Sequence, residues 1–533
     1  MSAVAESSGW TPARSVAGKR NPWTIVAVIS IATFMVVLDT SIANVALAHI
    51  AGSVSASYDE ATWVITSFLV ANAVIIPVSG WLADVVGRKR YYMISVAVFT
   101  LSSLLCGIAP NLSFLIVARV LQGIGGGGLT PVEQSMLADT FPPEKRGLAF
   151  AAYGIVVIAG PILGPTLGGW ITDNYSWHWV FLINVPVGLA SLGLVTIFVD
   201  EPSALRRRTA ELRVGGIKFD YIGFAFVALW LGCMELTLDR GQRDDWFSSP
   251  MITFFAIVAL LSFLALIPWE FMRKDPIVNV HLFRQKNFAI SCVLLFVLGA
   301  IVFGSTQFIP QLLQEVLGYN ATSAGLALTA GGIATIVMMP LSGILSSRVD
   351  LRLLIGFGFI MEVIAFWNMA HLSTQMSFGD AAVARMIQAI GLPFLFVPIS
   401  NVAYVGLKPE ENNQASALMN VARNLGGTVG ISTVQTLLAQ REQFHQSRLV
   451  EGLNPLNPNY VAALGHMTQV FGGQGGNAGR VALGTLYQSV LQQAAMLSYI
   501  EVFYVLMLIS LCALPLLFVM QKAKKDEITG ESV

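Results

Sequence analysis

Long apolar runs recur along almost the whole chain, and they limit what it can fold into more than any other feature. A helix needs roughly 20 mostly apolar residues to cross the hydrocarbon core of a bilayer. Only 12% of the 533 residues are charged, about half the fraction usual for a soluble domain. The sequence therefore predicts an all-α polytopic membrane protein with about fourteen transmembrane helices.

The positions of Lys and Arg set the orientation of these helices. We expect the spans at 23–50, 60–83, 91–109, 113–138, 147–170, 178–199, 219–238, 250–271, 288–310, 322–346, 353–370, 380–405, 414–439 and 497–520. With the amino terminus in the cytoplasm, 23 of the 31 basic residues fall in cytoplasmic segments, five on the opposite side and three inside spans. Basic residues concentrate in cytoplasmic loops. We therefore expect a multi-pass membrane protein with both termini in the cytoplasm.

Two short motifs of the early spans recur later in the same order. The segment 77–82 (PVSGWL) returns at 340–345 (PLSGIL), and 119–125 (RVLQGIG) returns at 385–391 (RMIQAIG). The offsets, 263 and 266 residues, are nearly equal, which argues against a chance match. Each pair of copies runs in the same direction across the membrane, so the chain is predicted to contain two six-helix halves in parallel repeat.

The repeat and the spans together divide the chain. We expect a cytoplasmic tail (1–22), a six-helix half (23–199), linkers with two inserted helices (200–287), a second six-helix half (288–520) and a final cytoplasmic tail (521–533). The second half includes a polar outward loop, 440–496. Both ends of this loop carry helical patterns, which predict two raised helices joined by a Gly-, Pro- and Asn-rich tip. The loop either docks a partner, folds back as a lid on the exit, or is an insertion without a role.

The remaining composition argues against catalysis. No HExxH, GxSxG or nucleotide-binding loop occurs, and the six histidines are scattered. The four cysteines lie in apolar runs without CxxC spacing, so we interpret them as packing residues. The formal net charge is zero, which gives no reason to expect a nucleic-acid partner. We expect a protein that is not an enzyme and that holds no cofactor or metal.

Charged side chains inside the spans are the best pointers to function, since each costs ~2.5–3.5 kcal/mol or more at the bilayer centre. Asp39 lies deep in the first span. It is either a proton carrier or a carboxylate paired permanently with an arginine, and Arg119 and Asn44 are its candidate partners. Glu133 follows Pro131 in the fourth span. It is either a proton or substrate site, or a water-facing residue near the interface.

Further polar residues inside the spans mark a candidate substrate cavity. We assign to it Asn44, Gln122, Gln307, Asn420, Arg423 and Asn424. The group on the thirteenth span has a second interpretation, as a contact with the other half. Glu362 in the eleventh span is either functional or a polar contact between helices. Three carboxylates lie near the ends of spans, where we expect water to solvate them: Glu235, Glu270 and Glu315.

Glycines shape the fourth and fifth spans. The run 125–128 is not a phosphate loop, because no Gly-Lys-Ser/Thr follows it, but it allows another helix to approach closely. The fifth span carries a flat glycine face and two bending prolines: Gly160, Pro161, Gly164, Pro165, Gly168 and Gly169. This face is either a seam that moves during transport or a rigid packing contact.

These motifs resemble those of the major facilitator superfamily, and the resemblance covers essentially the whole chain. The segment 80–90 (GWLADVVGRKR) is similar to the family's signature loop, with Gly80, Asp84, Gly87 and Arg88 at its marking positions. The second-half copy is degraded. The motif at 119–125 and the Gly-Pro motif of the fifth span are similar to those of antiporters. The segment 38–47 (LDTSIANVAL) resembles the first-helix signature of the fourteen-span drug:proton antiporters, among which the EmrB type is nearest.

The resemblance implies a proton-coupled multidrug efflux antiporter that exports hydrophobic or amphipathic small molecules by alternating access. Asp39 would be the proton site and Arg119 its tuning partner, with Glu133 as a further candidate for proton coupling. Asp84 and Arg88 would form an inner gate latch, and we expect Asp84 beside the start of the thirteenth span at 412–414.

The implied partners are drugs, protons, the bilayer, a periplasmic membrane-fusion adaptor on 440–496 and, through it, an outer-membrane channel. One rival function is transport of a single dedicated metabolite. The other is a non-transporting receptor or scaffold, which would have no need to bury Asp39 and Arg119.

Overall fold

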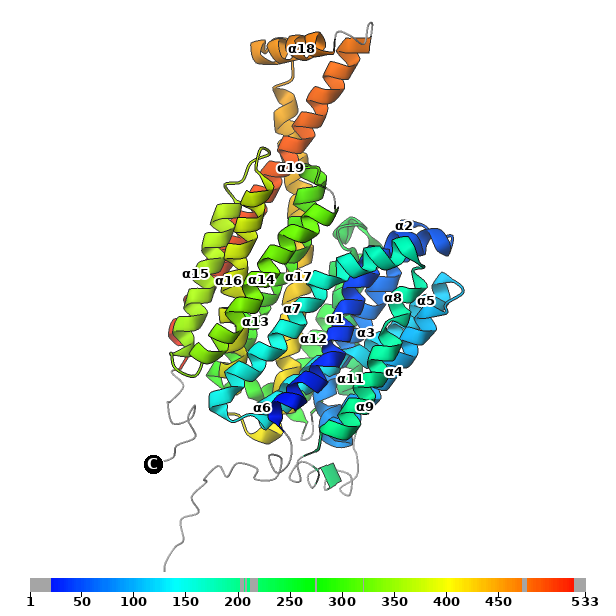
Figure 1. Ribbon diagram of the computed structural model, residues 1–533, viewed down its shortest axis with the longest axis vertical. Helices are drawn as coiled ribbons and strands as arrows, with labels where there is room; N and C mark the ends of the chain where they lie inside the picture. Colours follow the sequence, from blue (N-terminus) through cyan, green and yellow to red (C-terminus); the bar gives the residue numbers. More distant parts are fainter. Residues whose placement is uncertain are drawn as a thin grey trace, which may run out of the picture.

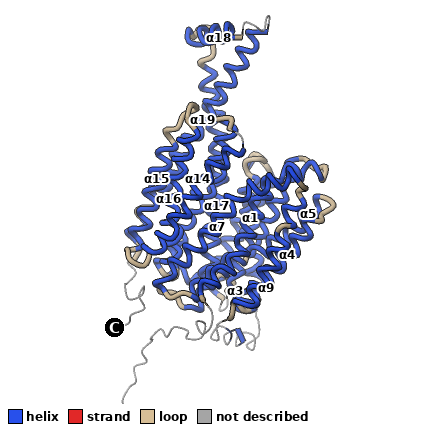
Figure 2. The backbone as a smooth tube through the Cα atoms, in the orientation of Figure 1, coloured by secondary structure: helices blue, strands red, loops and turns tan. Residues whose placement is uncertain are grey.

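The computed structural model describes residues 21–201, 206, 209–210, 219–273, 276–319, 321–471 and 477–521, and their regular structure is helical throughout (Figure 2). The first half comprises α1 (Pro22–Ser53), α2 (Tyr58–Ala61), α3 (Trp63–Val86), α4 (Arg88–Gly107), α5 (Leu112–Gly127), α6 (Leu129–Thr140), α7 (Pro143–Asn174), α8 (His178–Leu182) and α9 (Asn184–Phe198). The inserted pair is α11 (Tyr221–Arg240) and α12 (Pro250–Met272).

The second half begins at α13 (Lys286–Gln311), which a π-helical turn (Leu312–Val316) extends. It continues through α14 (Ala321–Leu345), α15 (Leu351–Met369), α16 (Phe378–Ala403), α17 (Asn412–Glu451), α18 (Pro458–Val470), α19 (Ala478–Ala513) and α20 (Leu516–Val519). Short 3₁₀ turns at Trp246–Ser248, Val280–Arg284 and Pro409–Glu411 join some of these helices.

The described residues contain fourteen long helical segments. Thirteen are long and apolar enough to cross a membrane, and several of these, such as α5 with α6 and α8 with α9, combine two consecutive helices. The fourteenth is α17, which is too polar to meet that measure but packs against α13, α3 and α19. Glycines allow this close packing, since a Cβ at Gly430 would lie 2.5 Å from the Cα of Ala300 on α13. Other helices therefore surround α17, which explains why its polar residues are tolerated.

The two halves have the same internal packing. In the first half α1 packs on α7, α3 on α5, and α4 on α9; in the second half α13 packs on α17, α14 on α16, and α15 on α19. Figure 1 shows the halves as two neighbouring bundles, blue to cyan and green to red. The parallel repeat predicted from the two motifs has this arrangement. The inserted helix α11 contacts both α3 and α17, so it bridges the halves.

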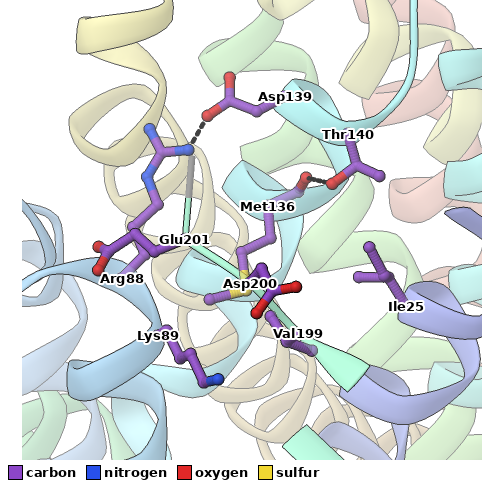
Figure 3. Close-up of a pocket in the computed structure, with 9 residues that line it drawn as sticks. All are labelled: Ile25, Arg88, Lys89, Met136, Asp139, Thr140, Val199, Asp200 and Glu201. Carbon is purple, nitrogen blue, oxygen red and sulfur yellow. Dashed lines mark hydrogen bonds and ion pairs between the residues drawn. The ribbon is translucent and has the colours of Figure 1, made fainter. Parts of the chain in front are cut away.

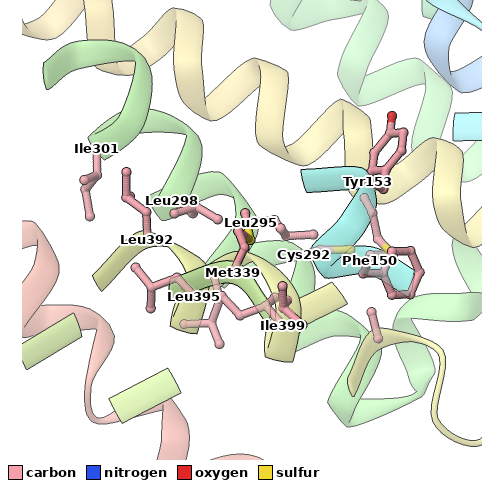
Figure 4. Close-up of a cluster of buried hydrophobic side chains, with 14 of the residues drawn as sticks. Phe150, Tyr153, Cys292, Leu295, Leu298, Ile301, Met339, Leu392, Leu395 and Ile399 are labelled. Carbon is pink, nitrogen blue, oxygen red and sulfur yellow. The ribbon is translucent and has the colours of Figure 1, made fainter. Parts of the chain in front are cut away.

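An apolar cluster joins the halves near the end of the bundle where α3 ends and α4 begins, which we call the gate end. Side chains of α7 meet those of α13, α14 and α16 there (Figure 4). The cluster includes Phe150, Tyr153, Leu295, Leu298, Met339, Leu395 and Ile399, all of them buried. The burial of these apolar side chains packs the two halves together at this end.

At the opposite end, α17 and α19 extend well beyond the bundle and carry α18 across their tip (Figure 1). We call residues 440–496 the extension. Gln446 on α17 donates a hydrogen bond to the Tyr487 hydroxyl on α19 at 3.0 Å, so the two helices run side by side. The predicted helical ends of this segment are confirmed. The last spanning helix begins at Ala478 rather than at 497, because α19 is continuous through both regions. Residues 472–476, within the predicted tip, lie outside the described part of the chain.

Candidate proton-coupling, cavity and gate sites

Asp39 lies at the centre of a buried hydrogen-bond cluster in the first half. Its Oδ2 accepts from Arg119 Nη1 at 2.6 Å, and its Oδ1 accepts from Gln122 Nε2 at 2.9 Å and from Asn184 Nδ2 at 2.6 Å. Asp39 is 1% exposed and Arg119 is fully buried. A buried ion pair offsets its desolvation cost only when further hydrogen bonds satisfy both partners. The Asp39 carboxylate has three donors and is satisfied, whereas Arg119 Nη2 has no hydrogen-bond partner among the described residues.

Arg119 is held from several helices at once. Its Nε donates to the Val64 carbonyl at 2.9 Å, its Nη1 donates to Gln122 Oε1 at 2.6 Å, and its guanidinium lies 4.2 Å from the centroid of the Phe68 ring. Gln122 also donates to Ser103 Oγ at 2.7 Å. The cluster therefore joins α1, α3, α4, α5 and α9, so a change in the charge of Asp39 affects all five helices.

The sequence correctly indicated Arg119 as a partner of Asp39, but Asn44 is not one. Asn44 is exposed and lies five residues from Asp39. Because an α-helix turns by about 100° per residue, this spacing places the two side chains on different faces of α1. Asn184 takes the expected role instead. Its position, as a polar residue within the apolar run 178–199, was the available signal.

Glu133 on α6 is a second buried carboxyl group in the first half. Its Oε2 accepts from Thr33 Oγ1 at 2.5 Å, and Thr33 lies 3.1 Å from the Tyr153 hydroxyl. Its Oε1 has no hydrogen-bond partner among the described residues. Glu133 is fully buried, so the interpretation as a water-facing residue is wrong. A charged carboxylate without a cation would pay several kcal/mol here, which suits a group that binds a proton.

A small cavity lies where α6 meets α13, α16 and α17. It is too narrow to hold a water molecule, and it is lined by Gln134, Leu295, Phe396, Ser400, Met419, Asn420 and Arg423. Asn420 Nδ2 donates to Gln134 Oε1 at 2.7 Å, and Arg423 Nη2 donates to Asn420 Oδ1 at 2.9 Å. The lining combines aromatic and thioether surface with one cation and amide groups.

Two of the six residues assigned to a substrate cavity, Asn420 and Arg423, line this one. Gln122 belongs to the Asp39 cluster instead. Asn44 and Gln307 are exposed, and Asn424 is half-buried outside the lining. Both interpretations of α17 hold in part, because Asn420 lines the cavity and also bonds Gln134 of the other half.

The gate end holds the predicted latch residues. Asn413 Nδ2 donates to Asp84 Oδ1 at 2.5 Å, which confirms the expected position of Asp84 beside the start of α17. Ser135 Oγ also donates to Asn413, at 2.5 Å. A Cβ at Gly80 would lie 3.0 Å from the Asn413 carbonyl oxygen. The two halves thus approach each other closely at this point.

Arg88 has a partner that the sequence did not reveal. It forms an ion pair with Asp139 at the end of α6 (Figure 3) and donates to the Pro409 carbonyl at 3.3 Å. Asp139 also accepts from Asn412 Nδ2 at 2.6 Å. Gly87, between α3 and α4, has a φ of +93° and faces Glu201, which explains a glycine at this corner. A chain of polar contacts therefore crosses from the first half to the start of α17.

The glycine face of α7 packs against the part of α1 that carries Asp39. A Cβ at Gly160 would lie 2.7 Å from Val37 Cγ1, and one at Gly168 would lie 3.0 Å from Ile42 Cγ2. Gly164 faces the Ser41 side chain still more closely, whereas nothing lies within 4 Å of a Cβ at Gly169. Gly160, Gly164 and Gly168 thus form the packing face, and Gly169 lies outside it.

The expectation that water solvates the carboxylates near the span ends is wrong for two of the three. Glu235 on α11 is buried and accepts from Thr428 Oγ1 on α17 at 3.1 Å. Glu270 on α12 is fully buried. Glu315 is exposed, as expected. The error arises because the inserted helices pack onto the halves, which a reading of span ends does not reveal.

The fold and these buried polar clusters define a multi-pass membrane transporter, and a model of the Major Facilitator Superfamily matches residues 29–431. The chain belongs to this superfamily. It is 40% identical over 477 residues to the Multidrug export protein EmrB of Escherichia coli (strain K12), covering 89% of this chain and 91% of that one. It is also 36% identical to the Fatty acid resistance protein FarB of Neisseria gonorrhoeae, covering 89% and 91%.

Solved structures show the same fold. The proton:xylose symporter XylE, bound to 6-bromo-6-deoxy-D-glucose, superposes with a TM-score of 0.60 at 12% identity and covers 95% of this chain and 97% of its own. The human organic anion transporter MFSD10 superposes with a TM-score of 0.56, also at 12% identity, over 92% of this chain and all of its own.

Proposed function

We propose that the protein is a proton-coupled antiporter that exports hydrophobic or amphipathic drugs across a bacterial inner membrane, with both termini in the cytoplasm. The observation that carries the proposal is the buried ion pair of Asp39 and Arg119, which a non-transporting scaffold would have no reason to maintain. The similarity to a multidrug export protein supports the choice of cargo.

The packing suggests how a proton at Asp39 would reach the gate. Protonation removes the negative charge that holds Arg119, Gln122 and Asn184 around α1. The same part of α1 packs on the glycine face of α7. In turn, α7 packs on α14, with Gly147 against Gly343 and Gly154 against Met339. A movement of α1 thus acts on the contact between the halves, which is the contact that alternating access must break and remake.

The cavity between the halves suits amphipathic cargo. Phe396, Met419 and Leu295 supply an adaptable apolar lining, while Arg423 and Asn420 supply polar contacts. In the arrangement described above the cavity has no room for cargo. We propose that it enlarges when the gate end opens and that cargo enters it from the cytoplasmic side.

The proposal is tested with purified protein in liposomes under an imposed pH gradient. Asp39→Asn should abolish gradient-driven accumulation of a fluorescent drug, because the residue can no longer bind and release a proton. Asp59→Asn makes the same chemical change at an exposed site in α2 and should transport like the wild type. Accumulation by Asp39→Asn at the wild-type rate would remove Asp39 from the coupling mechanism.

We further propose that the extension docks a periplasmic membrane-fusion adaptor and, through it, an outer-membrane channel. The extension exposes apolar side chains far from the bundle, including Leu456 at 93%, Val470 at 65% and Val461 at 52%. Exposed apolar groups gathered outside the bilayer are typical of a protein–protein contact. The paired helices hold them at a fixed height above the membrane.

A deletion distinguishes docking from an idle insertion and from a lid. Residues 450–482 can be replaced by a short Gly-Ser linker, because the hydrogen bond between Gln446 and Tyr487 places the cut ends side by side. Transport in vesicles should survive, while drug resistance of whole cells and co-purification of the adaptor should be lost. Leu456→Ser with Val461→Ser should reproduce the loss, and Gln469→Ala should not. Persistence of both resistance and adaptor binding after the deletion would contradict docking.

A further inference from the structure

The second half contains a buried cluster built like that of Asp39. In the first half, Gln122 Nε2 donates to Asp39 on α1 and to Ser103 Oγ on α4. In the second half, Gln388 Nε2 donates to Ser305 Oγ on α13 at 2.9 Å and to Glu362 Oε2 on α15 at 3.2 Å. In both halves the arginine three residues earlier donates to the glutamine Oε1.

The acid and the hydroxyl have exchanged helices between the two clusters. Ser305 follows Asp39 by 266 residues, the same offset that separates Arg119 from Arg385. The first helix thus carries an acid in the first half, Asp39 on α1, and a serine in the second half, Ser305 on α13. The third helix carries the complementary group, Ser103 on α4 and Glu362 on α15. Each Arg-x-x-Gln motif therefore binds one carboxyl and one hydroxyl group.

Glu362 differs from Asp39 in how its charge is compensated. It is fully buried, and it forms no ion pair among the described residues. Its Oε1 has no hydrogen-bond partner among them either. The cation that faces it is Arg385 on α16, which donates instead to Ser305 Oγ at 3.3 Å and to Thr306 Oγ1 at 3.2 Å.

Polar groups reach this carboxyl from α16, while α19, the other long helix packed on α15, presents aromatic side chains. The Ser305 hydroxyl on α13 is linked to the Glu362 carboxyl through Gln388, whose Nε2 donates to both groups. From α19, Phe503 stacks against Phe366, four residues after Glu362. A charged carboxylate without direct pairing is costly in such a site. The unpartnered Oε1 is where a proton can reside at low cost.

We propose that Glu362 is a second proton-binding site and that each transport cycle carries one proton through each half. This inference rests on the proposed proton coupling at Asp39. A proton taken up from the outside binds the Glu362 carboxylate. Its release to the cytoplasm leaves a carboxylate whose charge Arg385 compensates. The step transfers only a proton, and no group is oxidised or reduced.

The experiment measures the ratio of drug concentrations that liposomes maintain against an imposed pH gradient at zero membrane potential. Each coupled proton contributes a factor of about ten per pH unit. The wild type should therefore maintain about 100-fold and Glu362→Gln about 10-fold at a gradient of one unit. Glu315→Gln, at an exposed carboxylate, should match the wild type. An unchanged ratio in Glu362→Gln would overturn the inference.

A merely structural role predicts a different result. Loss of a polar packing contact would lower the unfolding temperature of Glu362→Gln without changing the ratio. The swap Glu362→Ser with Ser305→Asp moves the acid to the register of Asp39, where Gln388 still reaches it. This double variant should maintain the wild-type ratio. A ratio that stays at the Glu362→Gln level in the folded swap variant would count against the inference.

Two further outcomes are separable. A wild-type ratio that does not depend on the pH gradient at all would refute the proposed function itself.

Should Glu362→Gln fail to fold, the wild-type protein is treated with dicyclohexylcarbodiimide, which modifies protonated carboxyl groups in apolar surroundings. Mass spectrometry should find the adduct on Glu362, with less of it at alkaline pH. An unmodified Glu362 would overturn the inference.

Discussion

At the scale of single residues, the buried charges and their partners separate what sequence can predict from what it cannot. Asp39 and Arg119 stand out because charges are rare in apolar runs, so their pairing could be anticipated. Asn184 and Asp139 could not, because only the packing of α9 and α6 brings each of them to its partner. A neutral amide or an acid near a span end carries no comparable signal.

Removal of one member of the central ion pair should destabilise the fold. Arg119→Leu leaves Asp39 buried without its cation, and we expect a loss of about 3–5 kcal/mol in the free energy of unfolding. Adding Asp39→Asn should recover much of this loss, because an amide needs no cation and still contacts Gln122. Unfolding in detergent, followed by tryptophan fluorescence, measures both. If the double variant is no more stable than Arg119→Leu, an uncompensated charge is not the cause.

At the scale of elements, hydropathy located the spanning helices well but missed how the polar ones are accommodated. The length of α17 beyond the bilayer and the continuity of α19 depend on pairing between the two helices, as at Gln446 and Tyr487. The burial of Glu235 depends on α11 packing against both halves. Such features arise from helix–helix contacts, which the pattern within one span does not encode.

The glycine face of α7 offers a matched pair of variants. Gly164→Ala places a methyl group against the Ser41 side chain, and overpacking of this kind typically costs about 1–3 kcal/mol. Gly169→Ala, five residues further on, meets nothing within 4 Å. We expect the first variant to unfold at a lower temperature and to transport more slowly, while the second behaves like the wild type. Equal behaviour of the two would show that α1 and α7 are not tightly packed here.

The inserted helix α11 should be tied to α17 through Glu235. Thr428→Val leaves this buried carboxyl group without its donor, at a cost of about 1–3 kcal/mol. Thr436→Val is the control, because among the described residues the Thr436 hydroxyl bonds only the Ser432 carbonyl of its own helix. Thermal unfolding of the two variants gives the comparison. A larger effect at Thr436 would contradict the bridging role of α11.

At the scale of the whole molecule, the polar contacts between the halves gather at the gate end among the described residues. Asp84, Asp139 and Ser135 of the first half all bind the start of α17. The arrangement agrees with the predicted role of Asp84 as a latch that holds one state of an alternating-access cycle. Sequence located Asp84 through its motif and placed it beside the start of α17, while the roles of Asp139 and Ser135 came only from the structure.

Opening of the gate should follow from loss of this latch. Asp84→Ala removes the acceptor of the Asn413 amide, so the population with separated gate ends should increase. Spin labels at positions 90 and 347, both exposed and on opposite halves, report the separation in a cysteine-free background. Double electron–electron resonance should show a longer distance between the two spin labels in Asp84→Ala than in the parent protein. Identical distance distributions would exclude Asp84 as a latch.

One helix connects these distant regions. From Asn412 at the gate, α17 passes the cavity at Arg423 and the inserted helix at Thr428, and it ends at Glu451 beyond the bundle. Its 40 residues make a rod about 60 Å long. In a rod of this length a small tilt becomes a large displacement at the end. A tilt of about 10° around Arg423 would displace the tip at Glu451 by roughly 7 Å. A protein bound to the extension would therefore be displaced each time α17 tilts during the transport cycle.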